Sequence, residues 1–161
     1  MSTFTGQRSM SWDAVDITRL TDPFFVLRFW MPRGDTSADG HVTLALHDGT
    51  YVGGYWMDGV FTKSESYNDD VKRVGCNPNL TLKLFYKTHL PNDAAVKVWT
   101  KNTLFGLLLD PEVTCSSIVY SALLIGGASL DGMNFADVTP PVLRELVFGM
   151  VRNQVMDPEV D

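Results

Sequence analysis

The chain has 161 residues, of which 45% are hydrophobic and 20% are charged, as expected for one folded domain with a sizeable core. Its net charge of −6 and pI near 4.9 disfavour nucleic-acid binding, which needs a basic surface, and docking on anionic lipid. We therefore expect a single domain over residues 1–161, with its core in about 12–155, a short N-terminal tail and an acidic C-terminal tail at 157–161.

The N-terminal residues are polar and lack the apolar segment of a secretion signal. No run approaches the roughly 18 apolar residues that span a bilayer. The sequence therefore predicts no stable membrane insertion, and either a cytoplasmic location or export by a specialised secretion system.

The first half of the chain is predicted to form mainly β-strands. Aromatic and β-branched residues at Phe24–Trp30 predict a strand, followed by a polar loop. Residues 41–47 and 50–56 flank Asp48-Gly49, a strong hairpin signal, and are expected to pair as antiparallel strands. Residues 57–79 are polar and are interpreted as a loop, or as a lid over a site.

The second half is mainly helical, after one more strand at Leu80–Tyr86. Helical spacing follows Pro91-Asn92, with Asn92 or Asp93 as the cap. A further helix is expected from Cys115 to Leu124, before Gly126-Gly127, and the last one from Thr139 to about Gln154. Antiparallel strands followed by segregated helices indicate an α+β fold, in which a small antiparallel sheet packs against the helices.

Cys115 is the first candidate for chemistry, because it begins a predicted helix. The helix dipole and the unpaired N–H groups at that end stabilise a thiolate and an oxyanion. The alternative is a small buried hydrophobic residue, which most cysteines are. A disulfide to Cys76, the second cysteine, is not expected in a domain with this much core.

A thiolate nucleophile needs a neighbouring base, and the chain has three histidines. His47 lies beside the hairpin turn and His89 lies in a strand-to-helix connection, so both are interpreted as surface residues. His41 opens an otherwise apolar strand, from which its ring can reach a helix start. We therefore pair His41 with Cys115.

Two segments carry a resemblance to a known group: DGHVTLALHDGTYVGGYW at the histidine and VTCSSIVYSALLIGG at the cysteine. In this order they resemble the His strand and the nucleophile helix of permuted papain-like hydrolases. That group includes NlpC-type cell-wall peptidases and lecithin–retinol acyltransferase-type proteins. The resemblance covers about residues 24–130 and implies a circularly permuted papain-like fold with a Cys-His pair.

The chain departs from the family pattern at two places. Many relatives have Asn directly before the cysteine, where this chain has Thr114. The third polar residue, which orients the histidine, is expected on the next strand, yet residues 52–55 hold no His, Asp or Asn. Tyr55 or Asp58 is expected to substitute for it, unless a backbone carbonyl or a water molecule orients the ring instead. Tyr55 and Trp56 are also candidates to line a cleft.

The resemblance implies a cysteine hydrolase of amide bonds in peptidoglycan or other peptides, working through a thioester without a cofactor or metal. Such an enzyme is expected to act on a peptide or cell-wall fragment, and as an exported toxin or effector it would have an inhibitor or immunity protein. The alternatives are a lipid or thioester acyl hydrolase or acyltransferase of the same fold, and a binding protein with a degenerate site.

Other features of the sequence are interpreted as structural. Trp99 is expected in the core, and Gly53-Gly54 marks either a bulge or a close approach of substrate. Asp69-Asp70 is interpreted as solvated charge. The sequence contains no Cys/His spacing suited to zinc, no phosphate-binding glycine loop and no Gly-x-Ser-x-Gly elbow.

Overall fold

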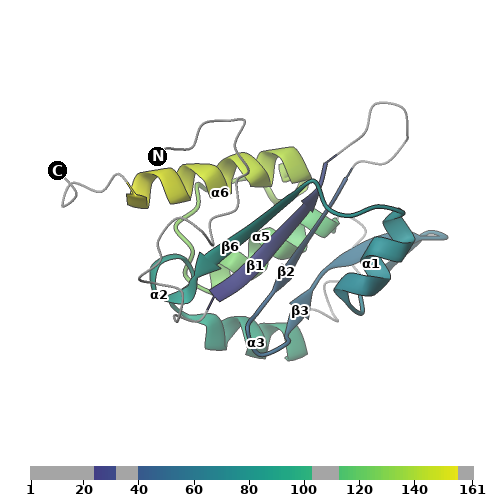
Figure 1. The fold of residues 1–161 in the computed structure, drawn as a ribbon, viewed down its shortest axis with the longest axis horizontal. Helices are drawn as coiled ribbons and strands as arrows, with labels where there is room; N and C mark the ends of the chain where they lie inside the picture. The colour runs from purple at the N-terminus through teal and green to yellow at the C-terminus, as the bar shows by residue number, and fades with distance from the viewer. Residues whose placement is uncertain (1–23, 32–39, 103–112, 156–161) are drawn as a thin grey trace.

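The protein is described by a computed structural model that covers residues 24–31, 40–102 and 113–155 (Figure 1). The expected N-terminal and C-terminal tails lie outside these ranges, as does most of the polar loop expected after the first strand. The strands are β1 (Phe24–Trp30), β2 (His41–Ala45), β3 (Tyr51–Val52), β4 (Gly54–Met57), β5 (Val60–Lys63) and β6 (Leu80–Phe85). The helices are α1 (Tyr67–Val74), α2 (Tyr86–His89), α3 (Asp93–Asn102), α5 (Cys115–Ile125), α6 (Pro140–Val155) and the short 3-10 helix η3 (Phe135–Asp137).

The main sheet has four antiparallel strands in the order β3-β2-β1-β6. Leu27 in its centre lies opposite Leu44 on one side and Leu82 on the other, and all three are fully buried. Because side chains alternate along a strand, His41 points to the face opposite Val42. The sheet therefore has one face for the apolar core and another on which His41 lies.

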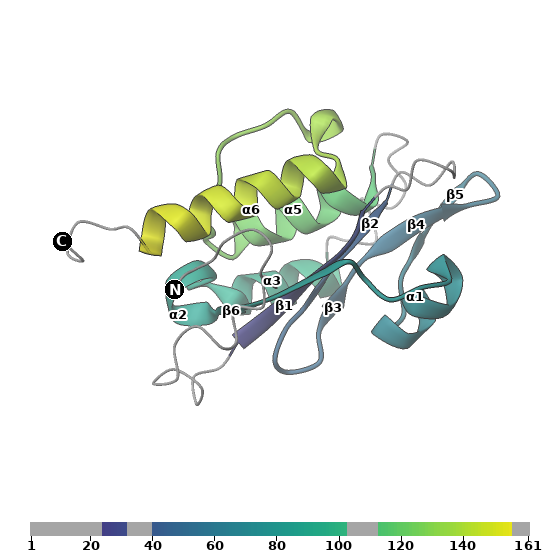
Figure 2. The same ribbon diagram turned by 45° about the horizontal axis from the view of Figure 1, so that its top comes forward.

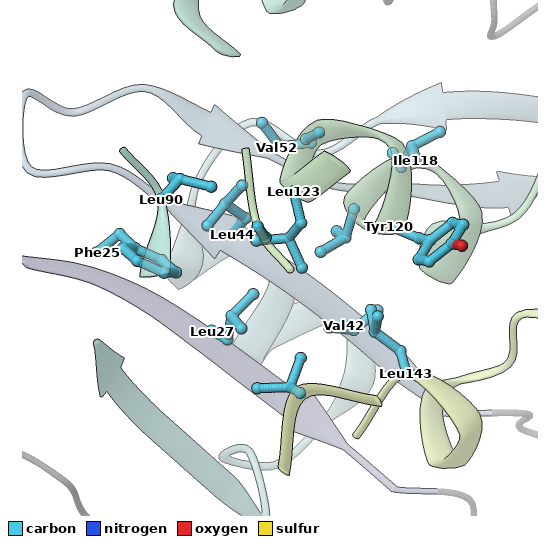
Figure 3. Packing of buried hydrophobic residues seen from close by; sticks show 14 of the residues in the cluster. Phe25, Leu27, Val42, Leu44, Val52, Leu90, Ile118, Tyr120, Leu123 and Leu143 are labelled. Carbon is cyan, nitrogen blue, oxygen red and sulfur yellow. The ribbon is translucent and has the colours of Figure 1, made fainter. Parts of the chain in front are cut away.

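Helix α5 packs against β2 on the core face, with α3 and α6 beside it (Figures 1 and 2). Leu123 of α5 lies beside Leu44 of the sheet (Figure 3), and Ile118 and Val42 belong to the same buried cluster. Helix α1 lies on the other side of β2 and β3 (Figure 2). The architecture is a mixed α+β fold with a small antiparallel sheet and several helices, as the sequence predicted.

The hairpin at Asp48-Gly49 is confirmed: Leu44 pairs with Val52, and Gly49 has a φ of 98° that favours glycine. The prediction of one strand over 50–56 is wrong, because the strand breaks at Gly53. A Cβ on Gly53 would lie 3.0 Å from the Thr43 side chain, so the chain passes close to the sheet there. After this break β4 leaves the main sheet and pairs with β5 in a second, two-stranded sheet.

The interpretation of residues 57–79 as a loop is also wrong. This segment contains β5 and the whole of α1, which begins at the N-cap Ser66 and ends at Gly75 with a φ of 90°. The Ser66 hydroxyl accepts from the Asp69 N–H at 3.2 Å, an N-terminal capping bond.

The predicted helices after residue 91 are confirmed as α3, α5 and α6, and the predicted strand at 80–86 is confirmed as β6. Trp99 is 8% exposed and belongs to the core, as expected. His47 is exposed, as expected for a turn, whereas His89 is 6% exposed, so its interpretation as a surface residue is wrong. Its short helix α2 packs between β6 and α6, which encloses the ring.

Within the described residues, no helix has both the length and the apolar character that crossing a membrane requires.

The core packing predicts a contrast between two adjacent leucines of α5. Leu123 is fully buried and Leu124 is 41% exposed. We expect Leu123→Ala to lower the free energy of unfolding by about 2–5 kcal/mol, since it removes buried methyl groups and leaves a cavity. Leu124→Ala, which has the same effect on helix propensity, should cost less than about 1 kcal/mol. Urea unfolding of both variants measures this, and equal losses would contradict the packing of α5.

Candidate active site

Cys115 is the first residue of α5, and the residues around it fix the helix start. Thr114 is the N-cap: its hydroxyl accepts from the Ser117 N–H at 3.1 Å. The Ser117 hydroxyl in turn accepts from the Thr114 N–H at 2.8 Å. This reciprocal capping box fixes the start of α5 and with it the position of Cys115.

The backbone at this helix start has donors available. Among the described residues, the N–H groups of Cys115 and Ser116 have no recorded hydrogen-bond partner, as the first helical positions generally do not. Both residues line a cavity. These two N–H groups can therefore hold an oxygen that becomes negatively charged beside the Cys115 sulfur.

His41 lies at the first position of β2 and faces away from the core. Its ring packs on Trp30, with ring centroids 5.2 Å apart. Its Nε2 lies 3.2 Å from Oδ1 of Asp70. The side chain of His41 also interacts with the Cys115 thiol. The ring thus stands between a thiol and a carboxylate.

Asp70 comes from α1, and its side chain is 1% exposed. Buried carboxylates need compensating donors, and Asp70 has them. Its Oδ2 accepts from the Tyr51 hydroxyl, and its Oδ1 accepts from the Ser64 hydroxyl at 3.0 Å and from Nη2 of Arg73 at 2.7 Å. The carboxylate that orients His41 is therefore itself held by three other side chains.

The pKa values of Cys115 and His41 shift in opposite directions. Burial alone would lower the pKa of His41, but its hydrogen bonds to Asp70 and Cys115 outweigh burial and raise the pKa above 6.5. Burial alone would raise the pKa of Cys115, but the hydrogen bond and the charge of His41 outweigh burial and lower the pKa. Opposite shifts of this kind favour a thiolate–imidazolium pair.

The pKa of Asp70 also shifts. Burial acts to raise it, but the hydrogen bonds from His41, Tyr51 and Arg73 lower the pKa of Asp70 from 3.8 to about 2. Asp70 is therefore ionised at every pH at which the thiol can react. The ionised Asp70 carboxylate also contributes to the free energy of unfolding at pH values above its ordinary pKa. That contribution is lost as the pH falls through about 2, the pKa of Asp70 in the folded protein.

The residues predicted to orient the histidine are corrected by this geometry. Asp58 lies in the turn between β4 and β5, with a φ of 53°, away from the ring. Within the described residues, Tyr55 forms no hydrogen bond to the His41 ring. Its own ring lies against the guanidinium of Arg73, with 3.8 Å between the Tyr55 ring centroid and Cζ of Arg73. The orienting position is taken by Asp70, whose interpretation as solvated charge is wrong.

The site opens into a cavity of about 690 Å³ within the described residues. Tyr55 and Trp56 line it, as expected for cleft residues, and the indole N–H of Trp56 donates to the Val113 carbonyl at 3.1 Å. Neither cysteine forms a disulfide within the described residues, and both border the cavity. Eight further lining residues are apolar or aromatic: Trp30, Met31, Phe61, Val74, Ala136, Val138, Pro140 and Pro141.

Sequence reasoning missed Asp70 and Arg73, although a local signal was present. Ser66-x-x-Asp69 is a helix start signature, and Gly75 follows at the right distance for a helix end. Recognising that helix would have placed Asp70 and Arg73 on one face, since residues three apart are neighbours on a helix. Nothing local indicated that this face packs on His41.

Among the described residues, no cluster of three or more His, Cys, Asp or Glu side chains is arranged to hold a metal ion. No protein-family model, curated protein or solved structure matches this chain.

The coupled pKa values predict a reactive thiol. With iodoacetamide at about pH 6, where an ordinary thiol is roughly 0.3% ionised, we expect Cys115 to alkylate much faster than a free thiol. Its rate should follow a plateau between the lowered pKa of Cys115 and the raised pKa of His41. His41→Ala should abolish the plateau and restore the steep pH dependence of an ordinary thiol. Peptide mass spectrometry separates Cys115 from Cys76, and an unchanged profile in His41→Ala would contradict the pairing.

The lowered pKa of Asp70 predicts a pH-dependent loss of stability. Asp70→Asn should reduce the free energy of unfolding by on the order of 2 kcal/mol near neutral pH, since one pKa unit corresponds to about 1.4 kcal/mol. The difference in the free energy of unfolding between wild type and Asp70→Asn should fall by about half at pH 3, because the stabilisation by the Asp70 carboxylate decreases below its ordinary pKa. Asp69→Asn, at the exposed neighbouring position, is the control. A wild-type advantage that does not shrink in acid would contradict the ionised, buried carboxylate.

Proposed function

We propose that this protein is a cysteine hydrolase that cleaves amide bonds in peptides, with peptidoglycan peptides or isopeptides among the candidate substrates. The observation that carries the proposal is the alignment of Cys115, His41 and Asp70 beside a cavity. Each of these groups has the neighbour its role requires: a base for the nucleophile, and an orienting carboxylate for the base.

The reaction would proceed in two stages. The Cys115 thiolate attacks the amide carbon, and the N–H groups of Cys115 and Ser116 hold the oxyanion. The His41 imidazolium then gives its proton to the amine, which leaves as the C–N bond breaks and a thioester remains on Cys115. Water attacks the thioester while His41 takes one of its protons, and the thiol leaves with a carboxylic acid as product.

The arrangement also supports our proposal that the fold is of the permuted papain-like type. The histidine lies on a strand that precedes the nucleophile helix in the chain, and that helix packs its apolar face on the same sheet. The orienting residue, however, comes from α1 and not from the strand after the histidine. We therefore propose a variant of that site, with Asp70 in the third position.

A second candidate is hydrolysis or transfer of a lipid acyl group. The apolar walls of the cavity, Trp30 and Phe61 among them, favour it, because an acyl chain would bury well there. The same nucleophile and base would serve, with an ester or thioester oxygen or sulfur as the leaving group. We place a purely binding role third, because the site keeps a nucleophile, a base and a buried carboxylate in contact.

The proposal predicts turnover that depends on Cys115. Purified protein incubated with muropeptides, synthetic peptides and acyl esters in H2(18)O should release a carboxylic acid carrying one (18)O atom, read by mass spectrometry. Cys115→Ala should reduce the rate at least about a thousandfold, because it removes the nucleophile. Asp58→Asn, in a turn outside the site, should keep the wild-type rate.

Which substrate class releases acid decides between the two enzymatic candidates. Peptide cleavage supports the amidase, and release from acyl esters alone supports the lipid candidate. Equal turnover by wild type and Cys115→Ala would contradict both.

A further inference from the structure

The charges that border the cavity are unevenly distributed. Among its described lining residues, Arg73 is the one with a permanent charge, and none is an Asp or Glu. Asp70, which pairs with Arg73, is buried and does not line the cavity. A ligand in the cavity therefore meets the cation of this pair without meeting its anion, although the chain as a whole carries a charge of −6.

Arg73 retains donors for a ligand. Its Nη2 lies 2.7 Å from Oδ1 of Asp70 and 3.1 Å from Nε2 of His41. One face of its guanidinium lies on the Tyr55 ring. The group has five N–H donors in a planar fork, and within the described residues no partner is recorded for Nε or Nη1. The side chain is 27% exposed, so these donors are not closed off from the cavity.

The location of Arg73 relates these donors to the reacting bond. Its Nη2 is in hydrogen-bond range of one nitrogen of the His41 ring, and the Cys115 thiol interacts with the same ring. The guanidinium and the Cys115 thiol are thus both neighbours of the His41 ring. A substrate group a few bonds from the attacked carbonyl can reach the guanidinium. Asp70 and Tyr55 hold the guanidinium in place, which reduces the entropy lost on binding.

We propose that Arg73 is a specificity-determining residue that binds a free carboxylate close to the scissile carbonyl. This inference rests on the proposed hydrolase function and narrows its substrate class to acidic peptides, or peptides cut near a free C-terminus. A guanidinium fork matches the geometry of a carboxylate, and charge-assisted bonds of this kind discriminate strongly against a neutral amide. The aromatic rings of Trp30 and Trp56 in the same cavity would contact the apolar part of such a peptide.

The test compares iodoacetate with iodoacetamide at Cys115. In both reagents the thiolate attacks the CH2 carbon and iodide leaves, and they differ only in a carboxylate replacing an amide. The ratio of the two rates cancels the fraction of thiolate, so it reports how the site treats the carboxylate. We expect the ratio at Cys115 to exceed that of a small free thiol by about tenfold or more, which corresponds to about 1.4 kcal/mol.

Variants assign this preference. Arg73→Met should lower the ratio of the iodoacetate rate to the iodoacetamide rate several-fold. The preference for iodoacetate that remains reflects the charge of His41. Arg73→Lys, which keeps the charge but loses the fork, should retain part of the preference and guards against misreading a folding defect. Lys72→Met removes a charge from the adjacent, exposed position, which does not line the cavity, and should leave the ratio at the wild-type value.

The outcomes separate this inference from the proposed function. Rapid alkylation by iodoacetamide with no preference for iodoacetate, or a ratio that Arg73→Met leaves unchanged, would overturn the carboxylate site while the hydrolase proposal stands. Equal losses in Arg73→Met and Lys72→Met would also overturn it, because they indicate a general charge effect. Cys115 inert to both reagents would overturn the hydrolase proposal, and this inference with it.

Discussion

The burial of the Asp70 carboxylate is the constraint on which the rest of the site depends. An ionised carboxylate taken out of water costs several kcal/mol unless it is fully paired. Tyr51, Ser64 and Arg73 pair it from three different elements or connections, and His41 completes the set. The same bonds that compensate the buried charge therefore attach α1 to the sheet and orient the His41 ring.

This network joins the two sides of the sheet. Helix α5 covers the apolar face, whereas α1, the helix that contains Asp70, lies on the other side of β2 (Figure 2). His41 can serve both because it occupies the first position of β2, at the end of the strand, where the sulfur of Cys115 lies 4.0 Å from the Gly40 carbonyl oxygen. A histidine in the middle of β2 would be separated from α5 by the sheet itself. The position of His41 in its strand is thus as important as its identity.

The parts of the site that follow from local sequence were predictable, and the part that follows from tertiary packing was not. Cys115 was placed by the apolar periodicity of its helix and His41 by the hairpin after it, both of which are short-range signals. Asp70 lies in a polar helix, and an acidic residue in such a helix is usually solvated. Its burial depends on Tyr51, Ser64 and Arg73 being brought together, which no periodicity indicates. The sequence marked Gly53-Gly54 as a bulge or a close approach of substrate, but not that the Thr43 side chain of the sheet would lie close to Gly53, which is again a tertiary contact.

The chemistry and the stability of the site have a common origin in this network. Burial alone would push the two titrating groups the wrong way, towards a neutral thiol and a neutral imidazole. The hydrogen bonds of His41 to Asp70 and Cys115 reverse that tendency and raise its pKa, and the hydrogen bond and charge of the His41 ring lower the pKa of Cys115. Arg73 acts in two directions: it keeps Asp70 ionised, but its own charge lies next to the imidazolium that Asp70 favours. A substrate carboxylate bound to Arg73 would offset that charge, so binding of an anionic substrate would itself favour the thiolate–imidazolium pair that attacks it.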